Sequence, residues 1–325
     1  MYNIEDIKTI HLEVTSRCQA SCPMCVRNIH GGIENPWLIL NEISLDQFKE
    51  WFPVEFIQQL DKLYMCGNTG DPVVAKDTLK IFEYLRNINP AMQLGMNTNG
   101  SAQNVNFWQY LATLNVVVRF GIDGLNDTHS LYRIGTDWDK IIENAQTFID
   151  EGGTAIWDML IFDHNKHQVE ECRQLSINLG FAEFVTKNTS RFKDGIHHVL
   201  DKTGKTSHVL HPSIKSKQIY NLLHTAEESC VINCKVKTEK SIYVNAHGEV
   251  APCCWLDFSG VPPLNLSLIN YKDNNFKNPS LKNNSLLEIF NSRFFETIEA
   301  SWDNPLRQCS RQCGTVDKFK EQFDD

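Results

Sequence analysis

The first 200 residues alternate between short apolar runs and segments with helical periodicity. Six runs rich in β-branched and aromatic residues are typical of buried strands, and they lie at 10–14, 62–67, 92–97, 116–122, 155–162 and 181–187. Between them, apolar residues recur with a period of about 3.6 residues, which predicts helices within 44–52, 76–87, 104–114, 138–153 and 167–180. Six successive β/α units predict an α/β fold, a partial (β/α)6 TIM barrel with its ligand site at the carboxyl ends of the strands.

Composition narrows the classes of function. The net charge of −9 over 325 residues argues against a broad electrostatic surface for nucleic acid. The sequence shows no signal-peptide pattern and no apolar stretch of about eighteen residues, so we expect no membrane span and a cytoplasmic location. Because thiols stay reduced there, the eleven cysteines are interpreted as metal or catalytic ligands and ordinary buried thiols.

Three cysteines follow the first predicted strand, in the order Cys18-x3-Cys22-x2-Cys25. Three thiolates at this spacing can hold three irons of a [4Fe–4S] cluster and leave the fourth iron open. The same thiolates with His11 or His30 would also suit a structural zinc site. The single compact group favours iron–sulfur over zinc.

In this position, the chain resembles the radical S-adenosylmethionine (radical SAM) superfamily. That family carries C-x3-C-x2-C in the loop after the first strand of a partial barrel; Met24 stands where it usually has an aromatic residue. The resemblance implies that the open iron binds the amino and carboxylate groups of S-adenosylmethionine (SAM). It further implies reductive cleavage of SAM to a 5′-deoxyadenosyl radical, with electrons from a low-potential donor such as flavodoxin or ferredoxin.

Two strand ends extend the resemblance. The segment "GNTGDP" stands where the family has a Gly-Gly-Glu-Pro-like segment, which implies that SAM's amino group is bound by Gly67, Asn68, Thr69, Gly70 and Asp71. Glycines permit a close backbone approach, and carbonyls with a carboxylate can accept hydrogen bonds from an ammonium group. The segment "NTNG" ends the third strand as the family's "TNG" does, and this match assigns Asn97 and Asn99 to binding of the cofactor.

The segment "FGIDGLNDTHSLYRIG" ends the fourth strand and resembles a further family segment. The resemblance assigns Arg133 to SAM's carboxylate and Asp123 to SAM or the substrate. Gly121 replaces the family's serine, so that contact is absent or supplied elsewhere. The alternative for Asp123 is an Asx turn with Gly124.

A second group of cysteines lies in the C-terminal region. Thirteen residues separate Cys234 from Gly248 and four separate Gly248 from Cys253, as in the element that opens the SPASM domain of radical SAM maturases. The dense run of further cysteines of a full SPASM domain is missing, and the pair Cys309-x3-Cys313 ends the cysteine pattern. The region therefore resembles the shortened "twitch" variant. The resemblance implies one auxiliary [4Fe–4S] cluster held by these four cysteines, with structural zinc as the alternative.

These patterns predict a barrel at 1–205, a linker at 206–228 and a small cysteine-rich α+β domain at 229–325. Within the last, "SIYVNAHGEVAPCCW" predicts a β-hairpin that turns at 245–248, and 278–300 predicts one helix. Cys66 and Cys254 remain candidates for hydrogen-atom donation to a substrate radical, against the alternative of ordinary buried thiols.

The resemblance favours modification of a peptide or protein, such as epimerisation, oxidation or cross-linking. A sugar or aminocyclitol dehydrogenase or epimerase is the alternative within the superfamily, because the first strand begins by residue 10 without a preceding peptide-recognition domain. A zinc-stabilised, non-catalytic binding protein is the alternative from another class.

Overall fold

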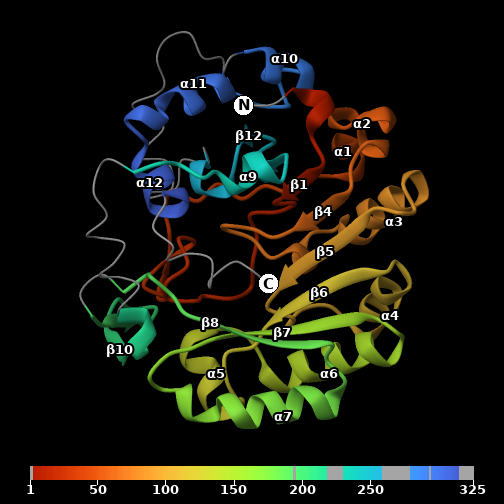
Figure 1. Ribbon diagram of the computed structural model, residues 1–325. Helices are drawn as coiled ribbons and strands as arrows, with labels where there is room; N and C mark the ends of the chain where they lie inside the picture. Colours follow the sequence, from red (N-terminus) through yellow and green to blue (C-terminus); the bar gives the residue numbers. More distant parts are fainter. Residues whose placement is uncertain (1–2, 193–194, 218–229, 258–278, 293, 315–325) are drawn as a thin grey trace.

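One eight-stranded sheet organises the protein. The computed structural model describes residues 3–192, 195–217, 230–257, 279–292 and 294–314 (Figure 1). The strand order of the sheet is β12-β11-β1-β4-β5-β6-β7-β8. The last six strands in this order run parallel and follow the chain, as six successive β/α units require.

The six predicted strands are confirmed. They are β1 (Thr9–Leu12), β4 (Lys62–Met65), β5 (Gln93–Thr98), β6 (Val116–Gly121), β7 (Thr154–Leu160) and β8 (Glu183–Lys187). Their alternate side chains divide between two environments. Ile10, Leu12, Leu63 and Met65 are fully buried in the main hydrophobic cluster, whereas the polar side chains of His11 and Tyr64 point to the other face.

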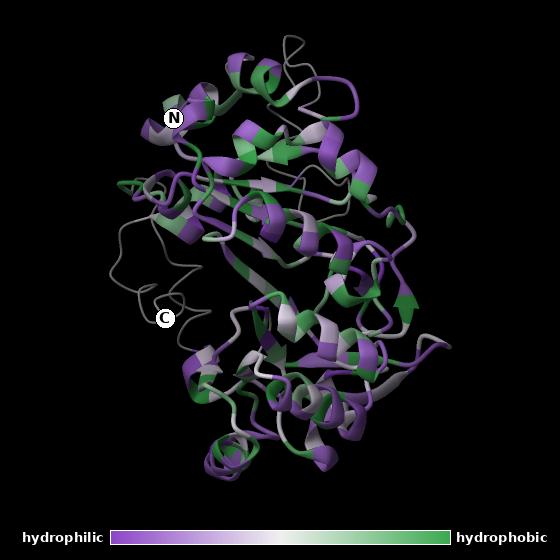
Figure 2. Cartoon of the chain, turned by 90° about the vertical axis from the view of Figure 1, so that its right-hand side faces the viewer, coloured by the Kyte–Doolittle hydropathy of each residue, from purple (hydrophilic) through white to green (hydrophobic). Residues whose placement is uncertain are grey.

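Helices cover the outer face of this sheet (Figure 1). They are α1 (Leu45–Trp51), α2 (Val54–Gln58), α3 (Thr78–Ile88), α4 (Val105–Thr113), α5 (Asn126–Tyr132), α6 (Trp138–Asp150) and α7 (Val169–Leu179). The five predicted helices are confirmed. Ser44 caps α1 in a capping box, the Asp137 side chain caps α6, and Gly180 ends α7 in the left-handed conformation. Figure 2 shows hydrophobic and hydrophilic residues side by side along the helices, as amphipathic packing requires.

The predicted C-terminal hairpin is confirmed, and it joins the barrel's own sheet. β11 (Ser241–Val244) pairs antiparallel with β12 (Val250–Ala251), and Gly248 adopts a φ of 78° in the turn. β11 also pairs parallel with β1, with Thr9 opposite Ser241 and Leu12 opposite Val244. The sheet therefore runs without interruption from the barrel into the C-terminal region.

The helix predicted over 278–300 is wrong as a single element. A capping box at Ser285 and Glu288 begins α10 (Leu286–Asn291), and α11 (Phe294–Ala300) follows; residue 293 lies outside the described residues. Residues before Ser285 are not helical, since Ser280 forms a bridge with Glu249. Among the described residues of this region, α9 (Lys235–Thr238) and α12 (Arg307–Cys313) are the other α-helices.

The expected linker begins with a strand. β9 (His197–Leu200) and β10 (Thr206–Leu210) form an antiparallel hairpin, while residues 218–228 lie outside the described residues. This hairpin contacts a second, smaller one, β2 (Asn28–Ile29) with β3 (Ile33–Glu34), because the Leu200 amide donates to the His30 carbonyl at 2.8 Å. The domain boundary near 205 stays a prediction.

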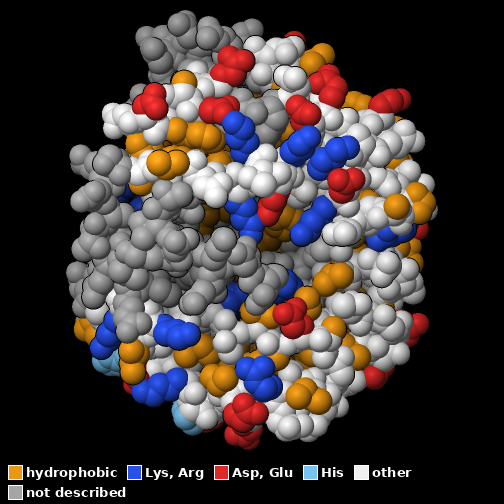
Figure 3. Space-filling model, viewed as in Figure 1, with side chains coloured by type: hydrophobic (Ala, Val, Ile, Leu, Met, Phe, Trp, Pro, Cys, Tyr) orange, Lys and Arg blue, Asp and Glu red, His pale blue; other side chains and the backbone are white. Residues whose placement is uncertain are grey.

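Short 3-10 helices complete the described elements: η1 (Ile4–Asp6), η2 (Pro72–Val74), η3 (Lys166–Gln168), η4 (Cys254–Leu256) and η6 (Ser301–Asp303). Among the described residues, the helices are all too short or too polar to traverse a bilayer. On the face drawn in Figure 3, acidic and basic side chains are interspersed among the described residues rather than gathered by sign.

Candidate active site

The first three cysteines lie in the loop after β1, at the carboxyl ends of the barrel strands. The Cys18 Sγ accepts from the Ala20 amide at 3.4 Å and from the Asn99 Nδ2 at 3.6 Å. The Cys25 thiol lies 3.8 Å from the Asn68 carbonyl oxygen. The loops after β1, β4 and β5 therefore converge on one site, as the sequence predicted for the three motifs.

Burial keeps the thiols of Cys18 and Cys22 protonated unless a cation is bound. It raises the pKa of Cys22 to about 11 and raises that of Cys18 further, with neighbouring negative groups adding to the shift and Arg133 opposing it at Cys22. A bound cluster iron would stabilise the thiolate form by its positive charge and so lower the pKa of the cysteines that bind it. Three cysteines on one compact loop, none of them in a disulfide, supply the three thiolates that a [4Fe–4S] cluster with one open iron requires.

Asp71 organises the loop after β4. Its Oδ1 accepts from the Thr98 hydroxyl at 2.8 Å and from the Val73 amide at 3.2 Å. Its Oδ2 accepts from the Asn99 amide at 2.7 Å and from the Asn99 Nδ2 at 2.5 Å. These four bonds use about the full acceptor capacity of a carboxylate, so Asp71 fixes Asn99 against Cys18. Its assignment to SAM's amino group stays a prediction.

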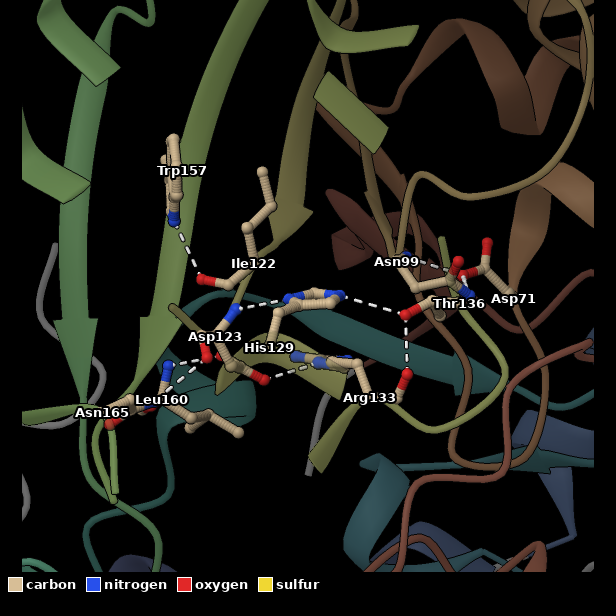
Figure 4. Close-up of polar contacts among 10 residues, drawn as sticks. All are labelled: Asp71, Asn99, Ile122, Asp123, His129, Arg133, Thr136, Trp157, Leu160 and Asn165. Carbon is tan, nitrogen blue, oxygen red and sulfur yellow. Dashed lines mark hydrogen bonds and ion pairs between the residues drawn. The ribbon is translucent and has the colours of Figure 1, made fainter. Parts of the chain in front are cut away.

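Arg133 and Asp123 form an ion pair beside Cys22, in which the Arg133 side chain is 20% exposed and the Asp123 side chain is fully buried. The Arg133 Nε donates to the Asp123 Oδ2 at 2.6 Å, and the Asp123 Oδ1 accepts from the Leu160 amide at 2.6 Å (Figure 4). The Asp123 carbonyl accepts from the Asn165 Nδ2 at 3.1 Å. Asp123 is fully buried, and these contacts hold the Arg133 guanidinium in place. The assignments of Asp123 to SAM or substrate and of Arg133 to SAM's carboxylate stay predictions.

His129 supports this ion pair through hydrogen bonds to the residues around it. Its Nδ1 accepts from the Asp123 amide at 3.0 Å, and its Nε2 lies 3.0 Å from the Thr136 hydroxyl, which donates to the Arg133 carbonyl (Figure 4). These partners assign the proton of the neutral ring to Nε2. Burial, helped by the charge of Arg133, lowers the pKa of His129 to about 3.

Gly121 leaves room for Arg133. A Cβ at this position would lie 2.6 Å from the Arg133 Nη2. The position where the family has serine is therefore filled by the guanidinium in this chain. The difference from the family pattern has a steric explanation, which the sequence alone did not provide.

Glu13 is a site residue that the sequence analysis missed. It is buried, and its Oε1 accepts from the amide and the hydroxyl of Thr69, both at 2.7 Å, and from the Gly70 amide at 3.1 Å. Gly70 is pressed against the loop after β1, because a Cβ there would lie 1.7 Å from the Thr15 carbonyl oxygen. A carboxylate within the apolar run "IHLEV" is the signal that could have found Glu13.

Cys66 lies at the end of β4, beside the site. Its amide donates to the Leu12 carbonyl at 3.1 Å, and its carbonyl lies 2.6 Å from the His11 Nε2. Burial raises the pKa of the Cys66 thiol to about 12, with Glu13 adding to the shift and a hydrogen bond with Asn97 opposing it. At neutral pH this thiol therefore keeps its hydrogen.

The four C-terminal cysteines come together. Cys234 and Cys313 share a hydrogen bond, which raises the pKa of Cys234 and lowers that of Cys313 to about 7. Burial raises the pKa of Cys253 and of Cys309 to about 12, and the neighbouring Cys313 adds to the shift at both. The backbone helps to form this group, since the Asn233 amide donates to the Cys313 carbonyl at 2.8 Å.

A fifth thiol, Cys230, lies beside this group. A Cβ at Gly314 would lie 2.7 Å from the Cys230 Sγ, and Ile232 forms a bridge with Gly314. Four thiolates can complete the ligand set of one cubane. In the part of the chain that the structure describes, no three His, Cys, Asp or Glu side chains are arranged around a single metal ion. The assignment of the four ligands stays a prediction.

Comparison with known proteins identifies the class. The family model described as the radical SAM superfamily matches residues 12–175, which is just over half of the chain. The chain belongs to the radical SAM superfamily. A second model, SPASM, described as an iron–sulfur cluster-binding domain, matches residues 234–314. A search of curated proteins gave no match.

Solved structures share the fold at low identity. Streptococcus suis SuiB bound to S-adenosylmethionine is 12% identical, with a TM-score of 0.60 over 94% of this chain and 72% of that chain. The structure of anSMEcpe with bound AdoMet is 14% identical, with a TM-score of 0.57 over 98% of this chain and 92% of that chain. The predicted partial barrel with a cysteine-rich C-terminal region is confirmed.

The chain is therefore an enzyme whose cofactors are SAM and [4Fe–4S] clusters. This confirms the predicted superfamily and cofactors. It also removes the alternative of a non-catalytic binding protein stabilised by zinc.

Proposed function

We propose that this enzyme abstracts a hydrogen atom from a peptide or protein substrate and so introduces a post-translational modification. Bound SAM supplies the 5′-deoxyadenosyl group that takes the hydrogen atom. The residues of the chain bind and orient SAM at the mouth of the barrel. Within this proposal, Arg133 binds SAM's carboxylate, the loop 67–71 binds its amino group, and Asn97 and Asn99 contribute to the same cofactor site.

The likeness to peptide-binding relatives carries this proposal. One SuiB structure is bound to the precursor peptide SuiA, and its TM-score to this chain is 0.59 over 94% of this chain. One anSMEcpe structure holds AdoMet with a Cp18Cys peptide, and its TM-score is 0.56 over 97% of this chain. Both relatives combine the fold of this chain with a bound peptide.

The thiols of Cys254 and Cys66 are the proposed hydrogen-atom donors. The Cys254 carbonyl accepts from the Asn68 Nδ2 at 2.9 Å, which places Cys254 directly against the loop assigned to SAM. Donation breaks the S–H bond, forms a C–H bond on the substrate radical and leaves a thiyl radical. One electron from a low-potential donor of the flavodoxin or ferredoxin class, with one proton, restores the thiol. The auxiliary cluster next to Cys254, held through Cys253, is the proposed route for that electron.

The test uses peptides encoded by short reading frames next to the gene. Reconstituted enzyme is incubated without air with SAM, dithionite and each peptide in D2O, and the products are analysed by mass spectrometry. Epimerisation adds about one mass unit from deuterium, whereas oxidation or cross-linking removes about two. Cys254→Ala and Cys66→Ala test the donors, and Cys172→Ala, a buried thiol on α7 away from the site, is the control.

Each outcome has a clear meaning. Deuterium incorporation that is lost in Cys254→Ala or Cys66→Ala, but kept in Cys172→Ala, supports the peptide and the thiol together. A product two units lighter supports the peptide substrate and removes the thiol donors. Turnover with sugars or aminocyclitols, and with none of the peptides, replaces the proposal with the small-molecule alternative.

A further inference from the structure

A buried group of polar side chains connects the loop after β4 with the C-terminal region. We call it the bridging cluster, and it consists of Glu13, Asn68, Tyr243, Asn245 and Asp257. Glu13 follows β1 and Asn68 follows β4, whereas the other three come from β11 and the residues after it. Glu13, Tyr243, Asn245 and Asp257 are almost completely buried. The cluster therefore joins the two matched domains in the interior of the protein.

Tyr243 is the centre of the bridging cluster. Its hydroxyl donates to the Glu13 Oε2 at 2.5 Å and lies 3.4 Å from the Asp257 Oδ2. Its position is fixed by the pairing of β11 with β1, where Tyr243 lies opposite His11. The two rings meet edge to face with their centroids 4.9 Å apart. One hydroxyl thus lies between two buried carboxylates that are more than 200 residues apart in the sequence.

Asn68 is the second connection. Its Nδ2 donates to the Cys254 carbonyl at 2.9 Å and lies 3.3 Å from both the Tyr243 hydroxyl and the Asp257 Oδ2. Its own carbonyl oxygen lies 3.8 Å from the Cys25 Sγ. Asn68 therefore contacts a predicted ligand of the first cluster on one side and the neighbour of Cys253 on the other.

Glu13 transmits the position of Tyr243 to the loop. Its other oxygen holds Thr69 and Gly70 through three hydrogen bonds, and Gly67 packs so closely that a Cβ there would lie 2.8 Å from the Glu13 Oε1. In a buried, water-poor setting, the loss of one partner leaves a polar group unsatisfied and moves its neighbours. A shift of β11 therefore displaces the loop 67–71, and a shift of that loop displaces β11.

From these contacts we infer that the bridging cluster couples SAM binding to the conformation of the auxiliary-cluster region, with Glu13, Tyr243 and Asp257 as positioning residues. Coupling between two sites is reciprocal, so SAM binding protects the C-terminal region by the same factor by which that region favours SAM. The inference rests on the proposed assignment of loop 67–71 to SAM, but it is independent of the substrate.

The experiment compares two Tyr→Phe variants of the iron-loaded enzyme. Tyr243→Phe removes only the hydroxyl of the bridging cluster and keeps the ring against His11. Tyr110→Phe is the matched control, because the Tyr110 hydroxyl donates to Glu83 at 2.7 Å on the protein surface. The dissociation constant of SAM is measured by equilibrium dialysis, and amide hydrogen exchange of peptides covering 241–257 is measured with and without SAM.

We expect the SAM dissociation constant to rise about tenfold in Tyr243→Phe and to change less than about twofold in Tyr110→Phe. SAM should slow exchange within 241–257 in the wild type and in Tyr110→Phe, but not in Tyr243→Phe. Equal affinities in both variants, or SAM-dependent protection that survives in Tyr243→Phe, would overturn the inference. A merely structural role of Tyr243 lowers stability without removing that SAM-dependent difference.

A second variant keeps the test decisive if Tyr243→Phe fails to fold. Asp257→Asn alters the C-terminal side of the bridging cluster, where the Asp257 Oδ2 accepts from the Asn68 Nδ2 at 3.3 Å, and substitutes no residue of the loop 67–71 itself. A SAM dissociation constant raised at least threefold supports the coupling, and an unchanged one contradicts it. Because both assays use SAM without substrate, an error in the proposed peptide substrate does not alter their result.

Discussion

The Nε of Arg133 lies 2.6 Å from the buried Oδ2 of Asp123, and this contact holds the guanidinium beside Cys22. The two residues stand ten positions apart, at the end of β6 and at the end of α5. Their pairing depends on the absence of a side chain at Gly121 and on His129, which fixes the backbone of Asp123. The positive charge at the site is thus set by a buried network rather than by an exposed arginine.

Removal of the counter-charge should destabilise the protein. In Asp123→Asn, Arg133 keeps its charge in a largely buried position without a carboxylate, and we expect a loss of about 3 kcal/mol in the free energy of unfolding. Urea denaturation of the iron-loaded enzyme measures this loss. Asp163→Asn is the control, since Asp163 forms an exposed pair with Lys166 at 2.6 Å and should leave stability nearly unchanged. Similar losses in the two variants would contradict a buried pair.

The steric role of Gly121 predicts a defect in SAM binding. Gly121→Ser places a Cβ 2.6 Å from the Arg133 Nη2 and should displace the guanidinium from Cys22. We expect the KM for SAM in uncoupled cleavage to rise about tenfold, with a smaller effect on kcat. In an Arg133→Ala background, Gly121→Ser should have no further effect. A full effect of the serine in that background would show that it acts elsewhere.

The C-terminal ligands can be separated from the first cluster. In Cys313→Ala, we expect the iron content to fall from about eight to about four per chain, because one cubane loses a ligand. Release of 5′-deoxyadenosine without substrate should continue. Cys172→Ala should keep the full iron content. A Cys313→Ala protein that keeps about eight irons would show that another residue, such as Cys230, completes the ligand set.

The buried histidine predicts a dependence of stability on pH. The pKa of His129 is about 3 in the folded protein, against about 6.5 in the unfolded chain. Above pH 6.5 both states are neutral there, so His129 contributes no pH dependence. Between about pH 6.5 and 3 only the unfolded state binds the proton, and stability falls by about 1.4 kcal/mol per pH unit.

His129→Asn removes this titration and keeps an acceptor near the Asp123 amide. The variant should show a shallower decline of unfolding free energy from pH 6 to pH 4, by about 1.4 kcal/mol per pH unit. His167→Asn, at an exposed position, should keep the slope of the wild type. Parallel curves for His129→Asn and the wild type would mean that the ring is protonated in the folded state.

The local pattern of the sequence predicted the barrel but not its continuation. The six barrel strands, β1 and β4 to β8, are short apolar runs, and the hydrophobic pattern of the sequence identifies such runs. The parallel pairing of β11 with β1 joins residues more than 200 positions apart, and no local pattern encodes such a contact. The sequence therefore predicts Tyr243 only as part of a hairpin and does not predict its hydrogen bond to Glu13.

In the candidate site, too, the sequence predicts local groupings of residues but not the long-range contacts between them. Cysteine spacing predicted the ligands of the first cluster because three thiols on one loop must lie together. Asp71 and Asp123 were predicted to face a ligand, whereas the structure shows their oxygens bonded to Asn99, Arg133 and neighbouring amides. Whether a carboxylate forms its hydrogen bonds with the protein or with a ligand depends on tertiary contacts, which a sequence motif does not describe.

The most direct test is the release of 5′-deoxyadenosine by the reconstituted protein. Protein prepared without air is given SAM and dithionite, and the product is quantified by chromatography beside an iron determination. We predict about eight irons per chain and continuous release in the wild type, with release abolished in Cys22→Ala and iron reduced to about four. A protein that holds no iron at the loop of Cys18, Cys22 and Cys25, or that releases no 5′-deoxyadenosine, would contradict the account.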